Sequence, residues 1–183
     1  MRYLAYALLA VAPVVSAQEL KLSVFDRLKD RCTDMTDINL PKNLIDVAKS
    51  FLPVDTPGDA ARFKRLADGL SGVMVKSCEF DKEGAYTDAD VKQLISELAG
   101  PGWNLIISST ENHGRDVSRI WIKAGGNGEV GGLRILSAEA KELAVVAITG
   151  RVRPEDIKDL GALGVPNILN DHNEKSPQKK NEE

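Results

Sequence analysis

The clearest periodicity in the chain predicts an amphipathic helix from Asp88 to Ala99. Apolar side chains recur there at helical spacing, as in a helix with one buried face, at Val91, Leu94, Ile95 and Leu98. Thr87 precedes this pattern and Asp90 follows three residues later, an arrangement similar to a capping box. Gly100-Pro101-Gly102 then ends the helix.

Shorter patterns predict four further helices, at residues 23–31, 41–51, 59–70 and 154–160. Pro41 suits the first turn of the second of these, because a helix start does not need the missing N–H. The stripe that this helix is expected to bury consists of Leu44, Val47, Ala48 and Phe51. Alternating or continuous apolar runs predict six strands, at residues 36–40, 73–80, 103–109, 117–124, 131–138 and 142–149.

The last four predicted strands follow one another through short polar or glycine-rich connections, which favour hairpins. The run from Leu143 to Ile148 is apolar on both faces, as in a strand at the centre of a sheet. Helices concentrate in the first half of the chain and strands in the second. We therefore expect an α+β fold: a single domain over residues 18–169, with helices packed on one face of a largely antiparallel sheet and a C-terminal β-meander.

Both ends of the chain fall outside this domain. Residues 1–17 join a short basic start to an apolar run from Leu4 to Val15 and then to Ser16-Ala17, which predicts a signal peptide and an exported protein, periplasmic or secreted. The apolar run is short for a bilayer span, although an uncleaved anchor is the alternative. No membrane span is expected after signal cleavage. Residues 170–183 are polar apart from Pro177 and predict a disordered tail.

The composition excludes several classes of function but does not identify one. A net charge of −3 argues against a nucleic-acid partner, because phosphate recognition depends on a cationic surface. Two His and two Cys in 183 residues argue against a zinc site, so no metal is expected. Aromatic residues make up only 5% of the chain, which does not favour a large aromatic-lined cavity, and no cofactor is expected.

Export would place Cys32 and Cys78 in an oxidising compartment, where two cysteines can form a disulfide. Closing that loop would stabilise the fold by about 4 kcal/mol in the chain-entropy model. Alternatively, Cys78 lies in a strand-like run and serves as a small buried apolar residue. Sequence spacing leaves both interpretations open.

Several short motifs follow one another in the order found in a known family. They are Gln18-Glu19-Leu20, Leu70–Ser77, Glu79–Tyr86, Gly100–Trp103, Gly131-Gly132-Leu133 and Glu142–Val146. Together they resemble the bacterial domain-of-unknown-function 4252 family over the whole mature chain except the polar tail. The resemblance implies an exported bacterial protein of one domain. It brings no catalytic or ligand-binding residues that can be placed on this sequence.

Three groups of residues invite a chemical interpretation, and each has a simpler structural one. The acidic stretch from Glu79 to Asp90 lacks the ligand order of a calcium loop, and its acids suit a helix N-terminus. Glycines 125–132 lie between two strand patterns, which favours a hairpin turn over a phosphate loop. His113 could act as a base oriented by Asp116, but a turn also selects such polar residues.

The candidate binding surface lies on two neighbouring predicted strands. Period-two alternation puts Arg119, Trp121 and Lys123 on one face, and Arg134 on the next strand could join them. If the helices cover the other face, Trp121 is an exposed anchor between cations. The alternative is a solvated face on which the tryptophan packs under the long cationic stems.

The function that fits these observations is a non-enzymatic binding module of the cell envelope, with a protein or peptide partner. One alternative is a hydrolase that uses carboxylates near Asp81 and Glu83. A second alternative is a regulatory component of envelope sensing.

Overall fold

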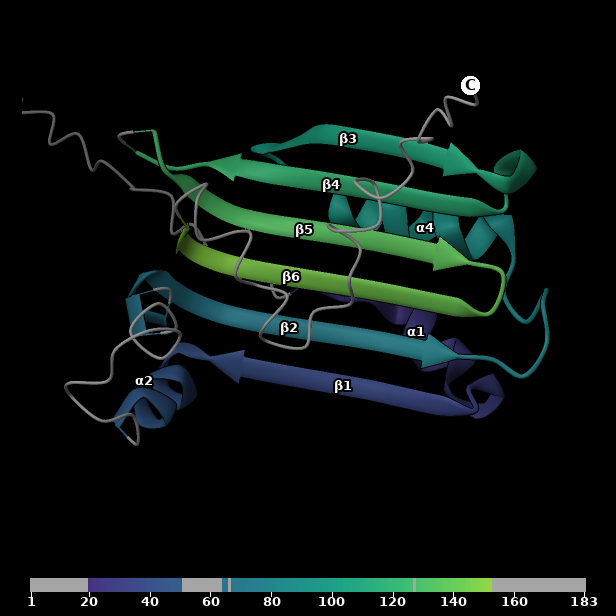
Figure 1. The fold of residues 1–183 in the computed structure, drawn as a ribbon, viewed down its shortest axis with the longest axis horizontal. Helices are drawn as coiled ribbons and strands as arrows, with labels where there is room; N and C mark the ends of the chain where they lie inside the picture. The colour runs from purple at the N-terminus through teal and green to yellow at the C-terminus, as the bar shows by residue number, and fades with distance from the viewer. Residues whose placement is uncertain (1–19, 51–63, 66, 127, 153–183) are drawn as a thin grey trace, which may run out of the picture.

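A computed structural model describes residues 20–50, 64–65, 67–126 and 128–152, which form one six-stranded sheet with accompanying helices (Figure 1). In chain order the elements are α1 (Ser23–Leu28), η1 (Lys29–Arg31), β1 (Asp34–Pro41), α2 (Lys42–Ser50), β2 (Leu70–Glu79), α4 (Asp88–Leu98), β3 (Trp103–Glu111), η2 (Asn112–Gly114), β4 (Asp116–Ala124), β5 (Val130–Glu139) and β6 (Glu142–Val152). The predicted α+β class and the six predicted strands are confirmed.

The strand order across the sheet is β1-β2-β6-β5-β4-β3, and each neighbouring pair is antiparallel. Strand β6 lies inside the sheet between β2 and β5, and its residues from Leu143 to Ile148 are buried. The central position predicted for this apolar run is therefore confirmed. Strands β1 and β3 form the two edges.

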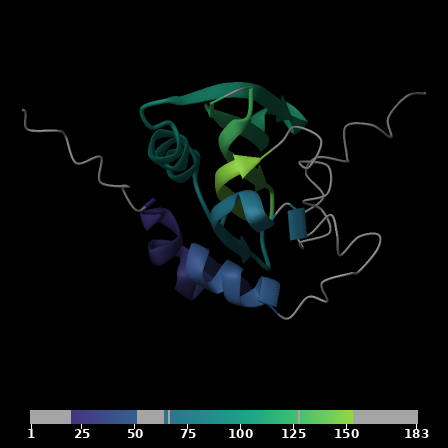
Figure 2. The same ribbon diagram turned by 90° about the vertical axis from the view of Figure 1, so that its left-hand side faces the viewer.

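One face of the sheet packs against α1 and α4, which Figures 1 and 2 show on the same side of it. A single core cluster joins these helices to the strands and contains Val24, Phe25, Leu28, Cys78, Val91, Leu94, Leu98, Trp121, Leu136, Ala138, Leu143 and Val145. We call this side the α1/α4 face. Burial of so many aliphatic and aromatic side chains is the main driving force for this half of the fold.

Helix α4 begins with the capping box that the sequence predicts. The Thr87 hydroxyl accepts from the Asp90 backbone N–H at 3.3 Å, and the Asp90 carboxylate accepts from the Thr87 N–H at 2.9 Å. Val91, Leu94 and Leu98 are buried as expected. The cap satisfies two N–H groups that the helix cannot pair internally.

The opposite face of the sheet has its own core cluster. It contains Ile45, Ala67, Leu70, Val75, Ile120, Leu133, Ile135, Val146, Ile148 and Val152. Ile45 is the buried residue that α2 contributes, whereas Leu44 and Val47 are 46% and 53% exposed. The predicted buried stripe is therefore wrong for Leu44, Val47 and Ala48, because the helix is turned so that Ile45 faces the sheet. Its fourth member, Phe51, lies outside the described residues.

Four further predictions concern Pro41 and the two ends of the chain. Pro41 ends β1 opposite Gly72, so its predicted place in a helical first turn is wrong. The predicted signal peptide (1–17), tail (170–183) and last helix (154–160) lie outside the described residues. Within the described part of the chain, no helix is long and apolar enough to cross a membrane.

Cys32 and Cys78 are joined by a disulfide, with their Cα atoms 5.3 Å apart. That separation lies in the normal range for such a bond. The bond ties the residue that follows η1 to β2, and Cys78 itself is fully buried in the core of the α1/α4 face. The disulfide therefore fixes the N-terminal helices onto the sheet.

Candidate functional site

The binding surface expected on β4 and β5 is not an open face. Trp121 is only 2% exposed and belongs to the core cluster beneath α1 and α4. Ile120, which points to the other side of the same strand, is 4% exposed. The prediction that Trp121 is an exposed anchor is wrong, because the helices pack on its face and the isoleucine face is buried as well.

Arg134 has a structural task on the α1/α4 face. Its guanidinium donates to the Leu98 carbonyl at 2.6 Å and lies 3.9 Å from the centre of the Trp103 ring. The guanidinium satisfies a carbonyl at the C-terminus of α4 and interacts favourably with the negative end of the helix dipole. Its position over the Trp103 ring makes a cation–π interaction. Burial lowers the pKa of Arg134 from its ordinary value. Arg134 therefore caps the C-terminus of α4 and packs over the ring of Trp103.

The other two predicted cations, Arg119 and Lys123, do not flank an exposed tryptophan either, because Trp121 is buried. Arg119 donates to the Ser109 carbonyl at 2.5 Å and to the Ser118 carbonyl at 2.9 Å, so it ties β4 to β3. Lys123 is exposed and pairs in register with Trp103. The four predicted residues thus consist of one core residue, two cations that hold backbone carbonyls, and one exposed cation.

The pairing of the strands instead brings together a row of carboxylates. Asp34 lies opposite Glu79, Glu79 opposite Glu142, and Glu142 opposite Glu139. On the next strand Val117 pairs with Ala138, so Asp116, which precedes Val117, is level with Glu139, which follows Ala138. Glu111 lies opposite Asp116. We call the set the acidic ladder: Asp34, Glu79, Glu142, Glu139, Asp116 and Glu111.

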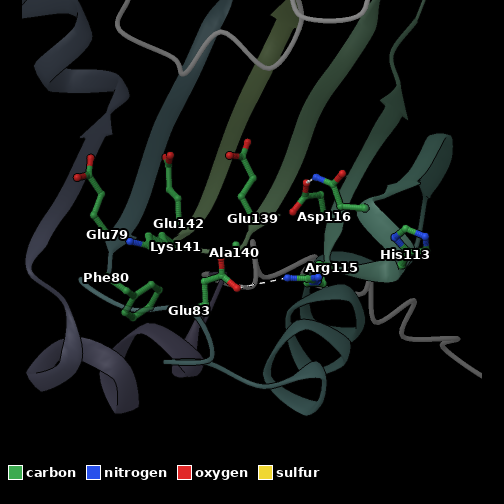
Figure 3. Close-up of a pocket in the computed structure, with 11 residues that line it drawn as sticks. Glu79, Phe80, Glu83, His113, Arg115, Asp116, Glu139, Ala140, Lys141 and Glu142 are labelled. Atoms are coloured by element: carbon green, nitrogen blue, oxygen red, sulfur yellow. Dashed lines mark hydrogen bonds and ion pairs between the residues drawn. The ribbon is translucent and has the colours of Figure 1, made fainter.

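The acidic ladder has one carboxylate on each strand at the same end of the sheet. Figure 3 shows four of its members, Glu79, Glu142, Glu139 and Asp116, following one another across the strand ends. Glu79, Glu142 and Glu139 each adjoin a core residue of the α1/α4 face, so the alternation of a strand points them to the opposite face. With neighbouring strands about 4.8 Å apart, the ladder spans about 24 Å.

Below the ladder lies a hollow of about 680 Å³. Its lining consists of Glu79, Phe80, Glu83, Asn112, His113, Arg115, Asp116, Glu139, Ala140, Lys141 and Glu142. Five of these side chains are carboxylates, and two, Arg115 and Lys141, are basic. Arg115 is already paired with Glu83 at 3.3 Å, so the hollow keeps a negative character.

Burial and charge repulsion both raise pKa values near the middle of the ladder. Burial raises the pKa of Glu142, and the negative charges of Glu139 and Glu79 raise it further. Burial, followed by the charges of Asp116, Glu139 and Asp88, raises the pKa of Tyr86 to about 12. The Tyr86 hydroxyl donates to the Glu139 carbonyl and fixes the end of β5.

Only one of the two residues proposed for hydrolase chemistry lines this hollow. Glu83 lines the hollow but is held by Arg115, whereas Asp81 is not among the lining residues. His113 lies on the rim with a positive φ of 59°, in the turn expected for it, and Asn112 there donates to Asp116. Among the described residues, no group of three or more His, Cys, Asp or Glu side chains could hold a metal ion.

Comparison with known proteins gives a match to a family model. The model described as "Domain of unknown function (DUF4252)" matches residues 30–160. No curated protein matches. A solved structure titled "Structure of crystal form III of TP0453" is similar at 18% identity and a TM-score of 0.21, over 70% of this chain and 48% of that chain. The chain therefore spans about half the length of that protein.

Proposed function

Since the chain belongs to the DUF4252 family, whose description names no activity, we propose from its geometry that it is an exported interaction module. Its acidic ladder binds a basic segment of a partner protein or peptide. The observation that carries this proposal is the presence of one carboxylate on every strand at one end of the sheet.

Such a row is unfavourable for the isolated domain. Like charges directly opposite one another on neighbouring strands lower stability. Burial raises the pKa of Glu142, and the repulsion from Glu139 and Glu79 raises it further. A partner with several Lys or Arg side chains relieves the repulsion on binding, so the same row that weakens the free domain strengthens the complex.

Two observations support export. The first is the signal-like pattern of residues 1–17. The second is the disulfide between Cys32 and Cys78, because such bonds persist in oxidising compartments. Mass spectrometry of the native protein tests this part: we expect the chain to begin at Gln18, and a chain that still begins at Met1 contradicts it.

The ladder is tested with a peptide of matched length. An extended peptide advances about 3.3 Å per residue, so eight residues span the ladder. We expect an octapeptide of alternating Lys and Ser to bind in calorimetry at low salt, and an octapeptide of alternating Glu and Ser not to bind. Added salt weakens the complex, since the ladder is largely exposed.

A matched pair of variants distinguishes binding by the ladder from attraction to the overall charge of the protein. Glu139→Gln/Glu142→Gln removes two charges from the ladder, and Asp26→Asn/Asp30→Asn removes two from exposed positions near α1. We expect the first variant to bind the lysine peptide at least about tenfold more weakly and the second to bind it as the natural chain does. Equal weakening in both would show attraction to net charge alone and would refute the ladder.

A further inference from the structure

Helix α2 turns most of its apolar side chains away from the sheet. Of its nine residues, all of which the structure describes, only Ile45 is buried. Leu44 and Val47 are 46% and 53% exposed, and Ala48 is exposed as well. We call Leu44, Val47 and Ala48 the α2 stripe. A surface helix normally buries its apolar stripe against the core, so this one is available to a partner.

The strand before α2 adds to this apolar surface. Ile38 pairs with Val75, so Ile38 and Leu40 lie on the sheet face to which α2 contributes Ile45. Both Ile38 and Leu40 are 40% exposed. Exposed apolar side chains that gather on neighbouring elements mark an interaction surface.

The charged residues of α2 lie along another side of the helix. Lys42, Asp46 and Lys49 are spaced by four and three residues, which puts them on one line. Asp46 pairs with each lysine at 3.1 Å. Lys49 also pairs with Asp68 at 2.7 Å, which brings the segment that contains Lys64-Arg65 beside α2. Among the described residues of α2 and this segment, four basic side chains meet two acidic ones, which leaves an excess of positive charge.

The acidic ladder lies at the other end of the sheet. β1 begins in the ladder at Asp34 and ends at Pro41, directly before α2, so the two surfaces are about 23 Å apart along the strand (Figure 1). A second copy docked on the α2 stripe through a two-fold axis would bring two positive surfaces together, which is unfavourable. An anionic surface is complementary to this end of the molecule and repels the ladder.

We propose that the α2 stripe docks on the anionic lipid surface of a membrane, with the acidic ladder turned away from it. The apolar side chains enter the boundary between headgroups and acyl chains, and the lysines on the other side of the helix stay among the headgroups. With nine residues, α2 lies in this interface and does not cross the bilayer. Attraction of the basic residues to anionic lipid sets the orientation. The ladder then faces the solvent, where a basic partner reaches it.

Cosedimentation of the purified exported chain with large vesicles tests the proposal. We expect the chain to bind vesicles made of equal parts phosphatidylglycerol and phosphatidylcholine at low salt, and to bind vesicles of phosphatidylcholine alone at least about tenfold more weakly. Added salt should reduce this difference. A chain that stays in solution with both kinds of vesicle, or binds both equally, overturns the proposal.

A matched pair of variants tests the apolar contact. Leu44→Ser/Val47→Ser should weaken binding to the anionic vesicles at least about tenfold, because two apolar side chains no longer enter the interface. Leu105→Ser/Ile106→Ser is the control, since these β3 residues are 50% and 52% exposed but lie on the opposite edge of the sheet. Equal weakening in both variants overturns the proposal. So does sedimentation equilibrium in which the natural chain dimerises and the α2 variant does not.

A second pair tests the charge. Lys42→Gln/Arg65→Gln should weaken binding to the anionic vesicles at least about fivefold. Lys29→Gln/Lys92→Gln removes two exposed basic charges far from α2 and should leave it unchanged, whereas equal weakening would show attraction to net charge and overturn the proposal. Leu44→Ser/Val47→Ser should bind the lysine octapeptide as the natural chain does when no vesicles are present. The α2 stripe and the acidic ladder therefore fail or succeed separately.

Discussion

Trp121→Ala tests the placement of the α1/α4 face most directly. Trp121 is 2% exposed and packs in the cluster formed by α1, α4 and the sheet. A buried aromatic side chain removes about 150–250 Å² from water, which at about 25 cal/mol per Å² corresponds to about 4–6 kcal/mol. Tryptophan-to-alanine changes in cores cost about 3–5 kcal/mol. We therefore expect the free energy of unfolding to fall by about 4 kcal/mol.

The assay is urea unfolding of the oxidised protein, followed by far-ultraviolet circular dichroism because the substitution removes one of the two tryptophans. Lys123→Ala is the control: it lies two residues along the same strand and face but is exposed, so its effect should stay within about 0.5 kcal/mol. A loss below about 1 kcal/mol for Trp121→Ala would show that the helices do not cover this face.

Three further changes have signs that follow from the structure. Cys32→Ser should lower the free energy of unfolding by about 4 kcal/mol in denaturant titrations, since it opens the disulfide loop. Gly132→Ala should cost about 1–3 kcal/mol, because its Cβ would lie 2.6 Å from the Trp103 ring, whereas Gly126→Ala meets nothing within 4 Å. The raised pKa of Glu142 means that ionisation opposes folding as the pH rises above 4.5. Glu142→Gln should therefore match the natural chain in acid and exceed its melting temperature at neutral pH.

Local signals in the sequence predict the local structure well. The cap at Thr87 and Asp90, the stripe of α4 and the short connection between β5 and β6 depend on neighbours in the chain, and the structure contains all three. The central place of β6 also follows from its own apolar residues. Each of these features is decided by residues a few positions apart, so propensity and periodicity suffice.

The error at Trp121 has a different origin. Alternation shows that Ile120 and Trp121 point to opposite faces, but it does not show which face receives the helices. Both faces of β4 are buried, so a hydrophobic residue on either side fits the pattern equally well. Only the contacts of α1 and α4, which come from distant parts of the chain, determine which face of β4 the helices cover.

The acidic ladder shows why a site can escape sequence reasoning altogether. Glu79 looks like a member of the acidic stretch that continues to Asp81 and Glu83. Strand pairing instead groups it with Asp34 and Glu142, which are far away in the chain. Register and strand order create the ladder, and neither can be read from local pattern.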